Sequence, residues 1–333
     1  MSQEHAFAQY VRILGKGRNG SRGLTAEEAY ESMRMIMSDE VEPIQLGAYL
    51  MLMRVKEETP EEVAAAVRAI REHLDIPANT PKVDLDWSSY AGKKRILPWY
   101  LLSTLLMAEN GIRIFMHGAS GHTAGRIYTK DVLPQLGVPV AKSLEEAARQ
   151  LEETNFSYID LEYLNPKLHQ IIELRPLLGL RSPVHTIARM LNPFNAPNVM
   201  QGIFHPGYRP THQEAGVLLD IPHMTVIKGE GGEIERNPDQ EVLLQCVHDG
   251  KMHDEEWPAM FAKRHVRPDE MNVGDLAAVW RGDKQDEYGE AAVIGTVAIA
   301  LYTMGKAKDR EEAEAQARTM WATRNKSRFQ NAA

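Results

Sequence analysis

Roughly the first 75 residues carry the spacing of apolar positions that is typical of amphipathic helices. The stretches "TAEEAYESMRMIM" and "TPEEVAAAVRAIREHL" each open on a capping box, formed by Thr25 with Glu28 and by Thr59 with Glu62. Between them, "PIQLGAYLMLMRVKEE" is apolar on most sides, so a helix here needs neighbours on several faces. We therefore expect a helical unit at the start of the chain, and its apolar excess predicts a homodimer formed through that unit.

Beyond the connector "DIPANTPK", short apolar runs alternate with helical patterns. Strands are predicted at residues 83–87, 112–118, 156–160, 198–204 and 223–229. Helices are predicted at 96–110, 143–154, 287–305 and 309–324. Two further short helices are predicted within 165–193, and one more between the last two strands. This alternation predicts an α/β domain built around a sheet.

Composition narrows the class of protein. The 333 residues are 43% hydrophobic and 25% charged, as in ordinary globular chains. The single cysteine, Cys246, excludes an internal disulfide and suits a reducing compartment. The first residues resemble neither a signal peptide nor a membrane span, so we expect a cytoplasmic protein without membrane association. The histidines lack metal-ligand spacing, and the net charge of −8 disfavours indiscriminate coating of nucleic acid.

Three loops that follow predicted strands carry glycine: "SSYAGKKR", "MHGASGHTAGR" and "KGEGGEIER". Ligands of α/β sheets bind beyond the carboxyl ends of the strands, and glycine lets backbone N–H groups approach an anion. In the first loop, Lys93, Lys94 and Arg95 directly precede an apolar helix, whose N-terminus is itself partly positive. An anion opposite them would offset this repulsion, although a solvated helix start is the plain alternative.

The order of these pieces resembles the anthranilate phosphoribosyltransferase family, also called glycosyl transferase family 3. "GAYLMLMRVKEETPEEVAAAVRAI" is similar to its N-terminal helices, and "MHGASG" stands where the family has Lys-His-Gly-Asn-Arg. "KGEGGEIE" stands where it has a Gly-x-Asp-Gly-x-Asp-Glu turn. Its Arg…Leu-Gly-x-Arg…Asn-Pro stretch is matched at Arg175, Gly179, Arg181, Asn192 and Pro193.

The resemblance implies a nucleoside phosphorylase/phosphoribosyltransferase fold, with a small helical domain and a larger α/β domain. The helical domain would cover residues 1–76, with 165–192 returning to it, and the α/β domain would cover 77–164 and 193–333. The cleft between the two domains would hold the ligand.

Departures from the family pattern bear on activity. The family's Gly-Thr-Gly-Gly-Asp-Gly loop, which cradles the donor diphosphate, is replaced by "WSSYAG", in which Trp87 and Tyr90 are expected to crowd the loop. Ala119 and Ser120 replace the Asn and Arg after His-Gly, and the magnesium-binding Asp-Glu pair becomes Ile234 and Glu235. Glu235 is then a weak remnant of the metal site, and we expect magnesium only if transfer activity is retained. Transfer to anthranilate is expected to be absent or very weak.

This combination is similar to a divergent branch of the family whose members include binders of DNA or RNA. The expected function is therefore nucleic-acid binding, with two open alternatives: a transferase with an altered donor or acceptor, and a regulatory homodimer that binds a small anion. Backbone binding is assigned to exposed cations at Lys93, Lys94, Arg95, Lys16, Arg18 and Arg22. Ligand contacts in the cleft are assigned to Gly92, His117, Gly118, Arg126 and Arg175. Glu233 and Glu235 are expected at the surface, Arg181 in a structural role, and no catalytic residue is assigned.

Overall fold

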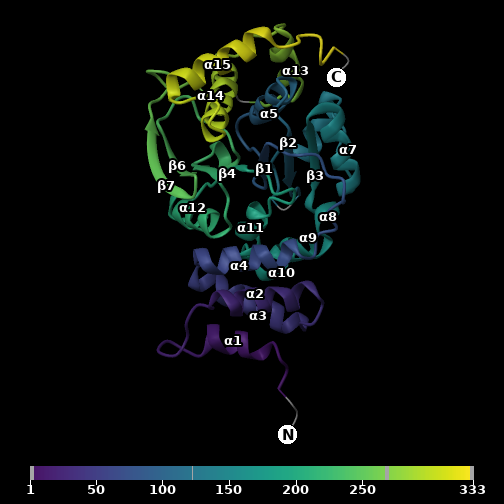
Figure 1. Ribbon diagram of the computed structural model, residues 1–333, viewed down its shortest axis with the longest axis vertical. Helices are drawn as coiled ribbons and strands as arrows, with labels where there is room; N and C mark the ends of the chain where they lie inside the picture. Colours follow the sequence, from purple (N-terminus) through teal and green to yellow (C-terminus); the bar gives the residue numbers. More distant parts are fainter. Residues whose placement is uncertain (1–3, 122, 267–269, 331–333) are drawn as a thin grey trace.

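The structure is a computed structural model that describes residues 4–121, 123–266 and 270–330. Its N-terminal helices form a bundle at one end of the long axis, below the sheet in Figure 1. They are α1 (Ala8–Gly15), α2 (Ala26–Met37), α3 (Pro43–Lys56) and α4 (Pro60–Arg71). Both predicted capping boxes are confirmed, because Thr25 and Thr59 each exchange hydrogen bonds with the glutamate three residues later.

A seven-stranded sheet with the order β3-β2-β1-β4-β5-β6-β7 forms the centre of the α/β part. The first five strands in sequence pair in parallel, and the last two continue the sheet antiparallel. The strands are β1 (Leu85–Ser89), β2 (Ile114–Gly118), β3 (Phe156–Asp160), β4 (Asn198–Gly202), β5 (His223–Ile227), β6 (Val242–His248) and β7 (Lys251–Trp257). The predicted α/β class with a smaller helical domain is confirmed.

Helices cover both faces of the sheet, and alternate residues of each strand enter two different cores. In β2, Ile114 and Met116 pack under the helices at the top of Figure 1, whereas Phe115 faces the opposite core. The first face is covered by α5 (Tyr100–Glu109), α13 (Gly274–Arg281), α14 (Glu287–Thr303) and α15 (Arg310–Thr323). The opposite face carries α7 (Leu144–Thr154) and α12 (Arg209–Leu218). Short α6 (Thr129–Val132), η1 (Leu133–Leu136), η3 (Pro206–Tyr208) and η4 (Glu230–Gly232) lie in the connections.

The short helices after β3 lie against the N-terminal bundle (Figure 1). Lys167 pairs with Asp39, and Arg71 of α4 donates to the carbonyl of Leu191 at 2.6 Å. The exact division at residues 76, 165 and 192 stays a prediction. These helices are α8 (Leu161–Leu164), α9 (Pro166–Ile172), α10 (Arg175–Leu178), α11 (Val184–Ile187) and η2 (Ala188–Met190).

Several local expectations differ from the structure, most of them by two residues at the end of a strand. The first strand begins and ends two residues later than predicted, at Leu85–Ser89, and α5 begins at Tyr100 rather than near residue 96. The β6–β7 hairpin was not predicted, because β7 is largely exposed and its residues "KMHDEEW" lack an apolar run. Within the described part of the chain, the helices are all too short or too polar to cross a membrane.

Candidate functional site

A cleft of about 260 Å³ lies between the helical bundle and the carboxyl ends of β4 and β5. Its walls come from the end of α3, from the loops after β1, β4 and β5, and from α11 with the loop before it. These are the positions at which α/β sheets of this kind bind ligands. Arg54, Ala91, Arg181, Arg189, Phe204 and Gly232 line it.

Arginines dominate the charge of this cleft. Burial and the neighbouring Arg189, Arg175 and Arg126 lower the pKa of Arg181 to about 10, so these guanidinium groups repel one another across a partly dry site. Among the described residues of the wall, Glu58 is the only carboxylate, and burial raises its pKa. The cleft is therefore built to attract a negatively charged group.

Two of these arginines also hold loops together. The Arg126 Nη1 donates to the carbonyls of Ala91 at 2.9 Å, Gly92 at 2.8 Å and Gly231 at 3.2 Å. Arg126 thereby joins the loop after β1 to the loop after β5, and it lines the cleft as expected for a ligand residue.

Arg175, expected to contact a ligand, is not among the described residues that line the cleft. Its Nη1 donates to Thr123 Oγ1 at 2.7 Å, and Arg181 donates to the same oxygen at 3.2 Å. The shared acceptor brings both guanidinium groups together. Arg181, expected to be purely structural, lines the cleft itself.

The anion that faces the start of α5 is a side chain of the protein. Glu235 is fully buried, accepts from Lys93 Nζ at 2.6 Å, and accepts the first helical N–H, that of Tyr100, at 2.9 Å. The prediction that Lys93 is exposed is wrong, since its side chain is 1% accessible. The predicted surface position of Glu235 is also wrong, because Glu235 is fully buried. An internal ion pair thus offsets the positive helix N-terminus.

Glu233 performs a similar task on the loop after β1. It is fully buried, and its Oε1 accepts the N–H groups of Ala91 at 2.7 Å and Gly92 at 2.6 Å. Its expected surface position is therefore wrong. Burial raises the pKa of this carboxyl, while the two backbone donors and Arg189 favour its charged form. Glu233 occupies an N–H pair of the kind that holds phosphate in glycine-rich loops.

Three residues expected to contact a ligand are enclosed by protein. His117 is fully buried, with Nδ1 2.8 Å from Tyr90 Oη and Nε2 3.2 Å from Asp86 Oδ1. A Cβ on Gly118 would lie 1.9 Å from the carbonyl oxygen of Ser89, so this glycine permits close strand pairing. The N–H of Gly92 is taken by Glu233. The placement of His117, Gly118 and Gly92 on the cleft surface is therefore wrong.

Trp87 also differs from its expected place. It is fully buried in the core beneath α5, and does not crowd the loop. Tyr90 instead lies near the cleft, since the guanidinium of Arg189 sits 5.4 Å from its ring centre.

The remaining cations stay at the surface. Lys94, Arg95, Lys16 and Arg18 are exposed, while Arg22 forms a two-pronged ion pair with Glu28 at 2.6 and 2.7 Å. The loop that carries Lys16 and Arg18 is tied to α3 by a hydrogen bond from Lys56 to Ser21 at 3.2 Å. The loop is thereby linked to the end of α3, whose Arg54 lines the cleft.

Several cleft residues were missed in the sequence. Arg54 donates to Tyr208 Oη at 2.6 Å and so joins the bundle to η3. Ser182 Oγ and His212 Nδ1 are buried polar atoms of the wall without a hydrogen-bond partner among the described residues. Burial and Arg189 lower the pKa of His212 to about 3, which keeps the ring neutral. Arg189 could have been predicted as a site residue from "HTIAR", because a cation next to an apolar helix face needs an acceptor or a ligand.

Comparisons with known proteins agree with this architecture. Residues 11–74 match the helical bundle domain of a glycosyl transferase family, and residues 100–323 match its a/b domain. The chain belongs to glycosyl transferase family 3. An uncharacterized protein from Aquifex aeolicus is 29% identical over 93% of this chain and 96% of its own. Anthranilate phosphoribosyltransferase from Burkholderia cenocepacia is 29% identical over 71% and 69%, respectively.

Solved structures of the family share the fold. Anthranilate phosphoribosyltransferase from Thermus thermophilus superposes with a TM-score of 0.77 at 24% identity, covering 96% of this chain and 95% of that one. The enzyme from Saccharomyces cerevisiae, in complex with PRPP and Mg, gives 0.78 at 16% identity, covering 98% and 97%. At these identities the likeness establishes the fold alone.

Proposed function

We propose that the arginine-lined cleft binds the phosphate backbone of a nucleic acid. The observation that carries this proposal is the group of guanidiniums around Arg181, whose pKa is lowered to about 10 by burial and by repulsion from these neighbours. A phosphate would relieve that repulsion and accept hydrogen bonds from several guanidiniums at once. A single carboxylate, Glu58, lines the described wall, so most of the positive charge remains available to a ligand.

The surroundings of the cleft favour a polymer over a small anion. Lys94 and Arg95 follow Ala91 of the cleft wall within a few residues, and Lys16 and Arg18 lie on the loop bonded to the end of α3. All four are exposed cations outside the cleft. Phe204 lines the cleft with 54% of its surface exposed, and an exposed ring can stack on an unpaired base. Phosphates in the cleft and a base on Phe204 would suit a single strand.

Contacts on the donor side argue against transfer from a diphosphate sugar. Glu233 takes the loop N–H groups of Ala91 and Gly92, and Glu235 is paired with Lys93 and the start of α5. Ile234, between them, is apolar and fully buried. Magnesium prefers several oxygen ligands, so these residues do not fit the ion.

Affinity for a fluorescein-labelled single-stranded oligonucleotide, measured by anisotropy at two salt concentrations, tests the proposal. The parent should bind with an affinity that falls steeply with salt. Arg181→Ala should weaken binding similarly for different sequences and reduce the salt slope by about one, as for one lost phosphate contact. Arg318→Ala, an exposed arginine of α15 far from the cleft, should bind as the parent does.

Two outcomes would contradict nucleic-acid binding. If Arg181→Ala and Arg318→Ala bind equally well, the cleft is not the site. If the parent turns over a phosphoribosyl donor and binds no oligonucleotide at low salt, the protein is a transferase with an altered donor or acceptor. A small-anion function would instead be indicated by binding of inorganic phosphate without oligonucleotide binding or turnover.

We further propose a homodimer formed through the helical bundle. Ile44 of α3 and Leu177 of α10 are 82% and 84% exposed, respectively. The two helices are neighbours, since a Cβ on Gly47 would lie 3.9 Å from Leu178. Exposed leucine and isoleucine on adjacent helices are typical of an interface. In light scattering, Ile44→Glu with Leu177→Glu should halve the mass, whereas Met252→Glu on the distant β7 should not. A parent with the mass of one chain would exclude the dimer.

A further inference from the structure

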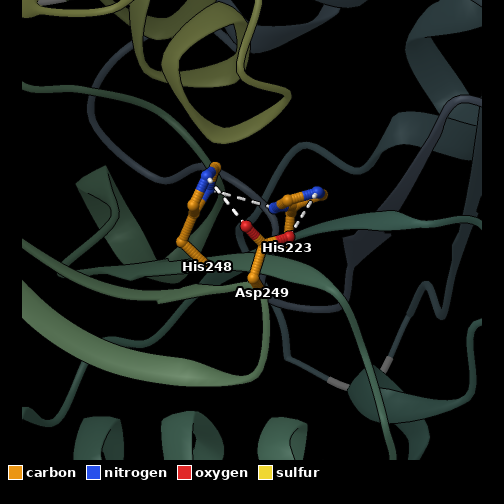
Figure 2. Close-up of side chains that lie close together, drawn as sticks. All are labelled: His223, His248 and Asp249. Atoms are coloured by element: carbon orange, nitrogen blue, oxygen red, sulfur yellow. Dashed lines mark hydrogen bonds and ion pairs between the residues drawn. The ribbon is translucent and has the colours of Figure 1, made fainter.

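A cluster of metal-ligand side chains lies at the opposite end of the sheet from the cleft. Figure 2 shows His223, His248 and Asp249 turned toward one another at the start of β5 and the β6–β7 turn. One ligand atom from each residue can be chosen so that all three lie within 4.8 Å of one another. We propose that these three residues form a binding site for a divalent metal ion of the zinc type.

The strand register brings the two histidines together. His223 and His248 are directly opposite in the antiparallel pair β5–β6, and their Nδ1 atoms are 3.0 Å apart. Two histidine nitrogens bound to one tetrahedral zinc at 2.0–2.1 Å would be about 3.3 Å apart. The rings therefore need to separate by only a few tenths of an ångström. They are partly or fully exposed, so this adjustment is open to them.

The carboxylate is positioned by the turn. Asp249 and Gly250 both have positive φ, 48° and 72°, as a tight two-residue hairpin turn requires. In this turn the Asp249 oxygens lie 3.9 Å from His223 Nε2 and 3.7 Å from His248 Nε2. Two imidazoles and one carboxylate are a common donor set for zinc, and solvent would complete the coordination.

The protonation state also suits a metal. A ligating histidine must offer a ring nitrogen that carries no proton. The contact between the two Nδ1 atoms likewise requires at least one of them to lack a proton. All ligands come from paired strands and a tight turn, so the backbone loses little freedom on binding.

The site is independent of the cleft. His223 is the first residue of β5, whereas the cleft lies beyond the last residues of β4 and β5. Sequence spacing gave no sign of it, because 25 positions separate the histidines and only the β5–β6 register joins them.

Calorimetric titration of the untagged full chain with ZnCl₂ tests the proposal. The parent should bind one ion per chain at this site, and His223→Ala and His248→Ala should each weaken binding about tenfold or more. Asp249→Asn should weaken it less, since an amide oxygen can still coordinate. His253→Ala, an exposed histidine on β7, and Cys246→Ser, which removes the only thiol, should bind as the parent does.

The same variants give a second readout. Zinc should raise the thermal midpoint of the parent and of the two controls, because it binds the folded state, where the β5–β6 register joins its ligands. It should not raise that of His223→Ala or His248→Ala. Binding that survives both histidine substitutions, or a parent that takes up no zinc at millimolar concentration, would overturn the proposal.

Discussion

Replacement of Lys93 by alanine is expected to destabilise the fold by about 3–5 kcal/mol, the usual cost of removing one partner of a buried ion pair. Lys93 is 1% exposed and Glu235 is fully buried, so the variant leaves a carboxylate without its cation. Lys94→Ala is the matched control, because the neighbouring lysine is exposed. Its cost should stay within about 0.5 kcal/mol. Urea denaturation of the three proteins measures both values.

The loss should depend on pH in a definite direction. Burial already raises the pKa of Glu235, and Lys93 is the main influence that lowers it, so the variant raises it further. A carboxyl whose folded pKa exceeds its unfolded value favours folding below the unfolded pKa, and this contribution disappears as pH rises through the folded pKa. Lys93→Ala should therefore be nearest to the parent in mildly acidic buffer and furthest from it at pH 8. An equal loss of stability at both pH values would show that an unpaired Glu235 carboxylate does not cause the loss.

The elements that could be predicted are those fixed by short-range chemistry. Capping boxes at Thr25 and Thr59 and the alternation of strands with helices depend on neighbours in sequence, and both are present. Which lysine of the "GKKR" loop is buried could not be predicted from the sequence of the loop alone. The Lys93 backbone pairs with Ile127 in an isolated bridge, which turns its side chain inward and leaves Lys94 outside. That register depends on a segment more than thirty residues away.

The carboxylates show why the site itself was harder to predict. Glu233 directly follows two glycines, and Glu235 comes two residues later in a largely polar loop, a pattern that usually indicates a surface position. They are buried because the loop after β1 and the start of α5 present three N–H groups to them. The sequence held one sign of this arrangement, the separation of Glu233 and Glu235 by a single apolar residue. This alternation allows Ile234 to enter the core while both glutamates face polar partners.

Removal of the Glu233 side chain should both weaken the fold and open an anion site. Glu233→Ala loses two charge-assisted hydrogen bonds and leaves the N–H groups of Ala91 and Gly92 without their acceptor. At about 1.5–3 kcal/mol for each such bond, partly regained from entering water, we expect a loss of about 2–4 kcal/mol. The vacated space lies next to two amide donors and within the field of Arg189, which already favours the charged form of Glu233.

Inorganic phosphate should restore part of this loss, because it can accept from the same N–H groups. Glu233→Gln is the matched control: Oε1 alone accepts both bonds, so a glutamine oxygen can keep them and no space opens. Phosphate also stabilises proteins in general through exclusion from their surface, so the quantity to compare is its extra effect on the alanine variant. A rise in thermal midpoint with phosphate that is larger in Glu233→Ala than in the parent and in Glu233→Gln would mean that this carboxylate occupies an anion site of the fold. Equal rises in all three proteins would mean that the loop N–H groups hold no such site once Glu233 is gone.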